Sequence, residues 1–229
     1  MRAHLSLVFA VSILLSFGGL MRAQPTINDN FVSAVTVSAG IDTTLQLIDQ
    51  SSVVYDEAGQ QDARIYEWYT GKQARFDFTN VHVYQLWEGV CAADCNTPEP
   101  KELAAGEYKY YPATGTCTVS DLPEPYPASG FFDFLENAHQ NGTCSSNGRT
   151  GTLWIYQPPT GSPFTEIDLC ANGNTPISMS WVGPFSATMT FNTFTPGVPS
   201  PANFVPPPAC LTAIPTLNQD LFFPFFHSN

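Results

Sequence analysis

The side chains in this sequence that could carry chemistry are 20 acidic residues, four histidines and six cysteines. A glycosidase needs only two carboxylates, so this abundance singles out no catalytic pair. The sequence contains no Gly-x-Ser-x-Gly elbow, no His-Glu-x-x-His motif and no Walker-type phosphate loop. We therefore expect a protein that is not an enzyme, and we assign no catalytic residue. A hydrolase would need several carboxylates that converge in one cleft.

Clustered acidic residues could bind calcium instead. Asp56, Glu57 and Asp62 lie close together in the sequence, as do Asp42 and Asp49. No loop has the ligand spacing of an EF-hand. A solvated acidic surface is the better explanation for most of these residues. We therefore expect no cofactor, with calcium as the one alternative, and its ligands stay unknown.

The cysteines predict disulfides rather than a metal site. They are Cys91, Cys95, Cys117, Cys144, Cys170 and Cys210. An even number of cysteines in an exported chain indicates a disulfide framework. Cys91 and Cys95 have no second closely spaced Cys or His pair to complete a zinc site. The spacing of the six cysteines alone leaves their pairing open.

The N-terminal residues predict export. A basic start, Met1–His4, precedes the apolar run Leu5–Leu20, and the small residue Ala23 follows. This order is typical of a cleaved signal peptide, which we place at residues 1–23. The alternative, a membrane anchor, needs about 20 apolar residues, and this run is shorter and interrupted by serines and glycines.

The exported chain should be extracellular or endolysosomal, with no transmembrane segment after cleavage. The sequon Asn141-Gly142-Thr143 predicts a glycan on Asn141 in a polar loop. Cleavage would remove Arg2 and Arg22, which leaves six basic against 20 acidic residues and a charge of −14. So few basic residues exclude a nucleic-acid binder and a polybasic membrane-surface protein.

The composition favours an antiparallel all-β fold. Only 12% of residues are charged, 43% are hydrophobic, and 17 Phe, 9 Tyr and 4 Trp supply many rings. Short aromatic or β-branched runs separated by Gly, Pro, Asn and Asp predict strands. We place them at 64–69, 74–78, 81–87, 108–111, 116–120, 130–134, 152–157, 165–170, 177–182 and 186–194. A short helix is predicted from Asp133 to His139. We read the proline-rich stretch 196–208 as an extended crossing segment, and residues 24–210 as one domain.

The rings exceed what a compact core needs, so they could also line an apolar cavity. Strand alternation places six candidate lining residues on the inward side: Phe78, Trp154, Tyr156, Trp181, Met189 and Phe191. The remaining residues, 211–229, form a Phe-rich tail. Its apolar run, Leu221–Phe226, should dock on its own domain, plug a cavity mouth or meet a partner, because a free run would aggregate.

The order of several motifs resembles the ependymin family of secreted glycoproteins. Val54-Tyr55-Asp56 followed by Arg64, the strand Arg75–Phe78, and Thr116-Cys117 are similar to elements of that family. Pro176-Ile177-Ser178 after Cys170 resembles its Cys-x-Pro-Ile element, here with a longer spacer. The stretch Phe204–Cys210 is similar to the family's closing Phe-x-Pro-Pro-x-x-Cys motif.

This resemblance implies two curved antiparallel sheets in a half-open sandwich around an apolar pocket, similar to bacterial lipoprotein carriers. It also implies a secreted, often dimeric glycoprotein that is associated with calcium, extracellular matrix and cell adhesion. Cys117 and Cys210 lie in matching motifs and should pair. Cys91–Cys95 and Cys144–Cys170 are the simplest completion.

The leading hypothesis is a non-enzymatic protein that binds a lipid or fatty acid. The first alternative is a calcium-linked matrix adhesion protein whose rings form only a core. The second is a carbohydrate-binding module, which would present Trp68 or Trp87 in an exposed flat row.

Overall fold

A computed structural model of the chain describes residues 23–40, 60–91, 102–122, 130–162, 164–183 and 186–214. The predicted signal peptide up to residue 22, the acidic residues Asp42, Asp49, Asp56 and Glu57, and the tail from residue 215 lie outside these ranges. The described part includes no helix with the length and apolar character that crossing a membrane requires.

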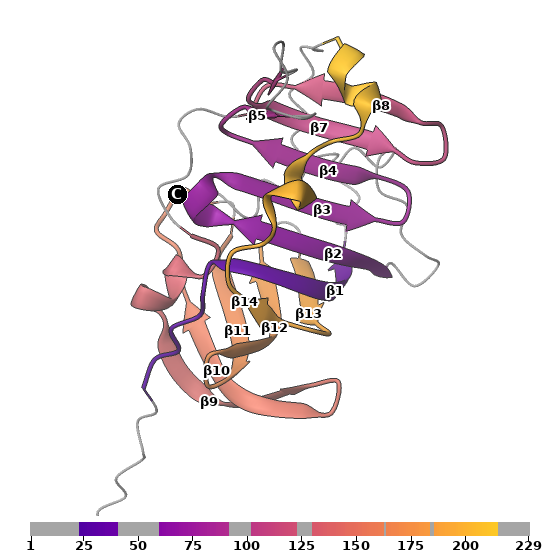
Figure 1. Cartoon of the computed structure of the whole chain (residues 1–229). Coiled ribbons are helices and arrows are strands. Elements are labelled where there is room, and N and C mark those ends of the chain that lie inside the picture. The colour runs from indigo at the N-terminus through magenta and orange to yellow at the C-terminus, as the bar shows by residue number, and fades with distance from the viewer. Residues whose placement is uncertain are drawn as a thin grey trace, which may run out of the picture.

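The described residues form strands joined by short 3-10 helices (Figure 1). The strands are β1 (Asn30–Gly40), β2 (Gln60–Trp68), β3 (Gln73–Phe78), β4 (His82–Leu86), β5 (Val90–Cys91), β6 (Glu102–Leu103), β7 (Gly106–Tyr111), β8 (Thr116–Ser120), β9 (His139–Ser146), β10 (Arg149–Tyr156), β11 (Glu166–Asn172), β12 (Thr175–Val182), β13 (Ser186–Phe191) and β14 (Thr195–Pro196). The 3-10 helices are η1 (Tyr69–Gly71), η2 (Asp133–Asn137), η3 (Pro201–Phe204) and η4 (Pro208–Thr212).

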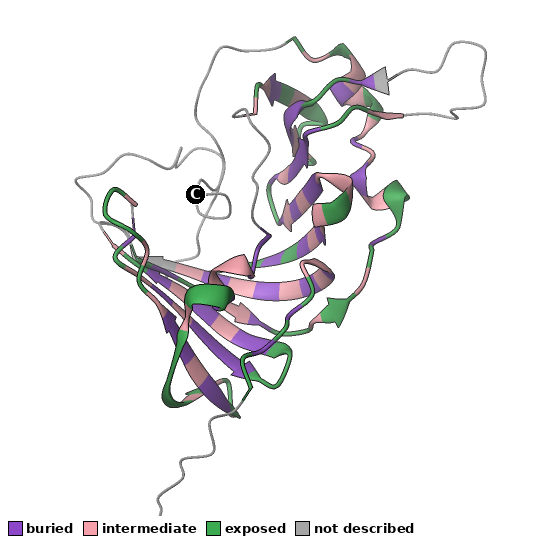
Figure 2. Ribbon diagram, turned by 90° about the vertical axis from the view of Figure 1, so that its left-hand side faces the viewer, coloured by how far each residue is buried: buried purple, intermediate pink, exposed green. Residues whose placement is uncertain are grey.

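Twelve of these strands belong to one antiparallel sheet. Its order is β8-β7-β4-β3-β2-β1-β13-β12-β11-β10-β9, with β14 added beside β1, and β5 and β6 pair separately. The predicted antiparallel all-β class is confirmed. Two separate sheets were expected, whereas hydrogen bonds connect the two halves into a single sheet. Figure 2 shows these halves meeting at an angle, so the half-open shape comes from one bent sheet.

Strand β1 connects the two halves. It pairs with β2 along Asn30–Ser38, with β13 along Val35–Gly40, and with β14 at Phe31 and Val32. Phe31, Val35 and Val37 are almost completely buried. Although the segment alternates, this strand was not among those predicted, because serine, alanine and threonine separate its large residues.

Two neighbouring segments also differ from their predicted structure. The strand predicted at 130–134 is a turn followed by η2, which agrees with the short helix predicted from Asp133. The polar loop expected around the sequon is strand β9, where Asn141 is exposed. Strand β8 has the predicted bounds. A tight Asn147-Gly148 turn with positive φ at both residues joins β9 to β10, which is the geometry that favours Asn-Gly in hairpins.

The two faces of the sheet differ in character. We call the face that carries Phe31, Val35 and Phe76 the inner face, and its buried side chains form the larger core. On the outer face of β11, β12 and β13, Asp168, Ser180 and Thr188 lie side by side. This alternation is typical of an antiparallel sheet with one wet and one dry face.

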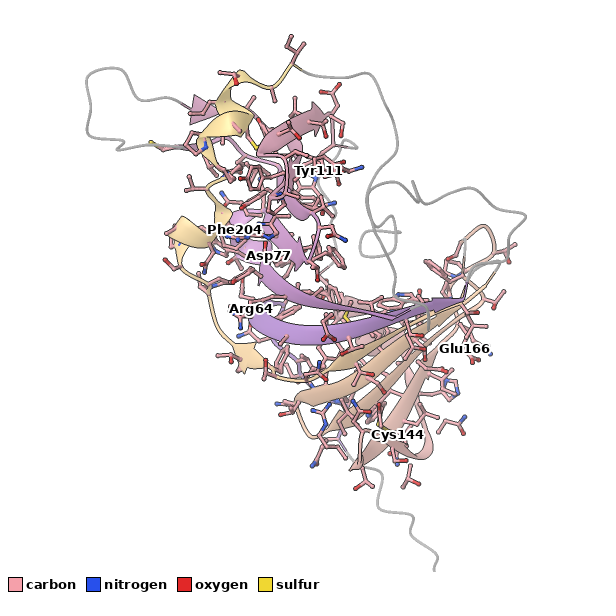
Figure 3. All side chains as sticks on the ribbon, turned by 90° about the vertical axis from the view of Figure 1, so that its right-hand side faces the viewer. Arg64, Asp77, Tyr111, Cys144, Glu166 and Phe204 are labelled. Carbon is pink, nitrogen blue, oxygen red and sulfur yellow. A yellow bond between two sulfur atoms is a disulfide. The ribbon has the colours of Figure 1, made fainter. Side chains whose placement is uncertain are left out.

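A second core covers the outer face of the other half, β2 to β8. There, Tyr84, Leu86 and Tyr108 pack with Phe204 and Cys210 of the C-terminal segment. The predicted crossing of 196–208 thus passes through β14 and η3 to η4. The Cys117–Cys210 disulfide attaches that segment to β8. Figure 3 shows Phe204 and Asp77 on this side of the sheet.

Arg75 on β3 joins this segment to the sheet. Its Nε and Nη2 donate to the two carboxylate oxygens of Asp77 at 2.6 and 2.8 Å, and its Nη1 donates to the Asn203 carbonyl at 2.8 Å. Its guanidinium lies 5.1 Å from the Tyr66 ring centroid and 4.9 Å from that of Tyr84. Burial alone would lower the pKa of Arg75, but the hydrogen bond and charge of Asp77 outweigh it and raise that pKa. The guanidinium therefore stays charged between Asp77 and the two tyrosine rings.

We expect Arg75→Met to lower the free energy of unfolding by about 2–3 kcal/mol, because it removes the charge-assisted hydrogen bonds to the partly buried Asp77. Urea unfolding measures this difference. Arg64→Met on the neighbouring strand is the matched control, since Arg64 is exposed, and it should change stability by less than about 0.5 kcal/mol. Equal losses in both variants would contradict the role assigned to Arg75.

Candidate binding face

All six residues predicted to line a pocket lie in or against the core of the inner face. Phe78, Trp154, Trp181, Met189 and Phe191 are each at most 5% exposed, and Tyr156 is partly buried against them. Strand alternation therefore assigned their common face correctly. Their burial shows that they pack against other atoms rather than line an open groove.

Cross-strand pairing arranges these residues in rows across the sheet. One row runs from Trp154 through Leu169 and Met179 to Met189 and Val37. The next row runs from Tyr156 through Ile167 and Trp181 to Ala187. A third runs from Phe191 through Val35 and Ala63 to Phe78. These rows form a continuous apolar surface over β10 to β13 and β1 to β3.

A segment that we call the cover segment, residues 130–138, packs on part of this surface. Phe131 and Phe132 lie 5.4 and 5.6 Å from Phe31, measured between ring centroids, and Phe132 lies 6.1 Å from Phe191. Further along the segment, Phe134 lies 6.0 Å from Tyr156. The cover segment thus spans the inner face from β1 to β10. Phe191, predicted to line a pocket, is instead packed beneath it.

A pocket of about 540 Å³ lies elsewhere, over β9 to β11. Its lining is mainly polar: Thr143, Cys144, Ser145, Thr150, Gly151 and Asn172. None of the six predicted lining residues contributes to it. This hollow is therefore not the apolar pocket that the resemblance implies.

Polar side chains occupy the inner face at the β4 and β7 end. Glu107 is fully buried, and Gln85 Nε2 donates to its Oε2 at 2.8 Å. Lys109 Nζ lies 3.6 Å from the other oxygen of the same carboxylate. The inner face is consequently amphipathic, with rings over one half and a hydrogen-bonded ionic cluster over the other.

A cluster of three carboxyl groups lies where the cover segment meets the sheet. Glu67 on β2 is directly opposite Phe31, is only 3% exposed, and has one carboxyl oxygen, Oε2, without a hydrogen-bond partner. Asp29, just before β1, accepts a hydrogen bond of 2.7 Å from the Phe132 backbone N–H. Asp133 Oδ2 accepts one of 2.5 Å from the Gly130 backbone N–H. The three groups come from three separate segments.

Burial controls the ionisation of this cluster. It raises the pKa of Asp29 to about 6, against a lowering by the Phe132 hydrogen bond and with a further rise from the Asp133 charge and hydrogen bond. Burial, and secondly the charge of Asp29, raise the pKa of Glu67 well above its ordinary value. The pKa of the neighbouring Tyr69 is also raised, by burial and then by all three carboxylates. Burial therefore favours the protonated form of Glu67, and Asp29 titrates near pH 6.

No sequence pattern indicates this cluster, because its members lie far apart in the chain. The cluster is no metal centre: within the described ranges, no group of three or more His, Cys, Asp or Glu side chains could hold a metal ion. It is not an open cleft either, since Glu67 is almost completely buried.

The structure also shows where the tryptophans of the carbohydrate-binding alternative and the predicted disulfides lie. Trp87 is 9% exposed, and Trp68 packs 5.8 Å from Phe204 on the outer face, so these two do not form the exposed row of a carbohydrate-binding module. The structure contains the Cys117–Cys210 and Cys144–Cys170 disulfides. Cys91 is also disulfide-bonded, and Cys95, its expected partner, lies outside the described residues.

No protein-family model matches this chain, and no curated protein matches it. Solved structures do. One is an uncharacterized conserved protein from Thermus thermophilus, with 9% identity, a TM-score of 0.45, and coverage of 81% of this chain and 90% of the other. Another is an outer membrane lipoprotein-sorting protein domain from Vibrio parahaemolyticus, with 9% identity, a TM-score of 0.31, and 72% and 84% coverage.

A third similar structure is a LolA superfamily protein from Nitrosomonas europaea, with 7% identity, a TM-score of 0.24, and coverage of 79% of this chain and 92% of the other. Identities and TM-scores this low say nothing about what this chain binds. Its function has to be inferred from its own inner face.

The raised pKa of Asp29 predicts a pH-dependent stability. A carboxyl whose pKa rises on folding stabilises the fold below its ordinary value of 3.8, and this contribution is lost as the pH increases through about 6. We expect the free energy of unfolding to decrease by about 2–3 kcal/mol across this range on account of Asp29. Denaturant unfolding of wild type and Asp29→Asn, at several pH values between 3.5 and 7.5, isolates this contribution as the difference between the two curves.

Asp121→Asn, at an exposed position, controls for the removal of one carboxylate. The free energy of unfolding of this variant, plotted against pH, should run parallel to that of the wild type. A wild-type minus Asp29→Asn difference that does not change with pH would show that Asp29 does not have the raised pKa.

Proposed function

We propose that this chain is a non-enzymatic protein that binds the apolar part of a lipid or fatty acid on the inner face of its sheet. The observation that carries the proposal is the continuous apolar surface over β10 to β13, where Trp154, Met189 and Trp181 lie in adjacent rows. The outer face of the same strands is polar. Within the described residues, the cover segment with η2 is the only helical element that packs on this surface.

Burial of acyl chains would drive binding. Each square ångström of apolar surface removed from water contributes about 25 cal/mol, before the costs of association. The buried cluster of Gln85, Glu107 and Lys109 at the other end of the same face offers polar groups of both charges. An amphipathic molecule matches this division of the face better than a purely apolar one does.

The same proposal places the protein in an oxidising, exported compartment, extracellular or endolysosomal. Disulfides between β8 and η4 and between β9 and β11 support it, because such bonds persist outside the cytosol. Asn141 is exposed on β9, where a glycan would be accommodated.

A long-chain fatty acid brominated on its chain tests the proposal, because bromine quenches tryptophan only at contact distance. We expect it to quench part of the fluorescence of the full chain. Trp181→Phe on the inner face should remove a quenched component. Trp68→Phe is the matched control, since Trp68 packs on the outer face, and it should leave the quenched component intact.

Native mass spectrometry of the purified chain gives an independent measurement, in which a lipid mass should accompany the protein. An absence of both bound lipid and quenching would contradict the proposed function. Quenching that disappears in Trp68→Phe and persists in Trp181→Phe would place the ligand on the wrong face.

A further inference from the structure

We propose that Asp29, Glu67 and Asp133 form a proton-operated latch, which holds the cover segment on the inner face when protonated and loosens it when Asp29 ionises. The latch would regulate access to the same face that binds lipid, so its role in ligand exchange rests on the proposed function. The conformational step itself concerns only this chain and can be measured without a ligand.

The latch is built from hydrogen bonds between the start of β1 and the cover segment. Asp29 accepts from the Phe132 N–H at 2.7 Å, and Asp133 turns the chain by accepting from Gly130 N–H. A Cβ atom at Gly130 would lie 2.4 Å from the Asp29 carboxyl carbon, so any larger residue would displace the Asp29 side chain from its present position. The cover segment, salmon in Figure 1, is thus seated directly on the carboxyl group of Asp29.

The ring contacts of the cover segment depend on its hydrogen bond to Asp29. Phe131 and Phe132 contact Phe31, whose direct partner across the ladder is Glu67. Any movement of Phe132 away from Asp29 also withdraws its ring from Phe191 on the apolar surface. The hydrogen bonds to Asp29 and the ring contacts of the cover segment should therefore form and break together.

The groups that face Asp29 make its ionisation unfavourable. These are Asp133 from the cover segment, Glu67 from β2 and Tyr69 from η1. All three are acidic side chains, so none of them can carry a positive charge that would stabilise an ionised Asp29. Glu67 Oε2 is buried without a hydrogen-bond partner, so the site offers no neutralising contact on that side either.

This arrangement favours the protonated form of Asp29. A protonated Asp29 can share its hydrogen with Asp133, as paired carboxyl groups do, whereas two adjacent charges repel in a dry site. Near pH 6, Asp29 loses its proton to solvent. The ionised carboxylate gains hydration if the cover segment moves away from it. The segment should consequently open more often at neutral than at acidic pH.

Hydrogen–deuterium exchange of the full chain, corrected for the intrinsic pH dependence of exchange, tests the latch. We expect the protection of amides in residues 130–138 to fall between pH 5 and 7.5, with a midpoint near 6. The upper limit over this range is about tenfold, since the opening equilibrium increases about tenfold per pH unit below the pKa of Asp29 and levels off above it. Amides of β11 and β12 should keep their protection, which distinguishes local opening from unfolding.

Asp29→Asn keeps the shape of the side chain and cannot ionise, so its cover segment should stay protected at every pH. Asp133→Asn is a second variant, and it should lower the midpoint because it removes the neighbouring charge. Asp168→Asn is the matched control: burial also raises the pKa of Asp168, but this residue lies on β11, away from the latch. Its exchange should match that of the wild type. Protection of 130–138 that is independent of pH in the wild type would overturn the proposal.

A fluorescent long-chain fatty acid separates the latch from the proposed function. If the latch controls access, the fatty acid should dissociate faster above pH 6 from the wild type, and at a pH-independent rate from Asp29→Asn. A pH-dependent exchange step without any fatty-acid binding would support the latch and contradict the proposed function. Binding accompanied by flat exchange would contradict the latch and leave the proposed function supported.

Discussion

The backbone ladder of β1 is the constraint on which the rest of this structure depends. This strand pairs with β2 on one side and with β13 and β14 on the other. It thereby converts two meanders, one before and one after the middle of the chain, into a single bent sheet. Because backbone groups buried in a sheet must be paired, removing β1 would leave two open edges facing each other across the core. The inner face exists only because this strand is present.

The bent sheet uses its two faces differently in its two halves. Around β2 to β8 both faces are covered: the C-terminal segment with its disulfide and Arg75 covers the outer face, and the inner face carries buried polar groups. Around β10 to β13 the outer face is polar and the inner face is apolar. The cover segment crosses this boundary between rings and carboxyl groups. Its attachment therefore combines hydrophobic packing with hydrogen bonds to a buried acid.

Sequence patterns predicted much of this arrangement where neighbouring residues determine it. Alternation placed Trp154, Met189 and Phe191 on one face, and Thr116–Ser120 has the predicted bounds. Patterns failed where the determining contacts are distant. β1 has small residues between its apolar ones, so only its pairing with β2 and β13 marks it as central. β9 is polar along its length and is a strand because a tight turn returns it to β10. Five rings and Met189 on one face predicted a pocket, yet whether such side chains pack together or leave space depends on what lies over them.

The sequence by itself determined the class of fold, the common face of the predicted residues and the absence of a recognisable catalytic motif. These follow from composition, from the two-residue period of a strand and from short motifs, all of which are local in the chain. Only the tertiary structure decided that Asp29, Glu67 and Asp133 meet, because they lie on segments more than 100 residues apart at the extremes. A carboxyl group is ordinary in sequence, and it becomes a proton-sensitive contact only when folding removes its water and supplies no cation.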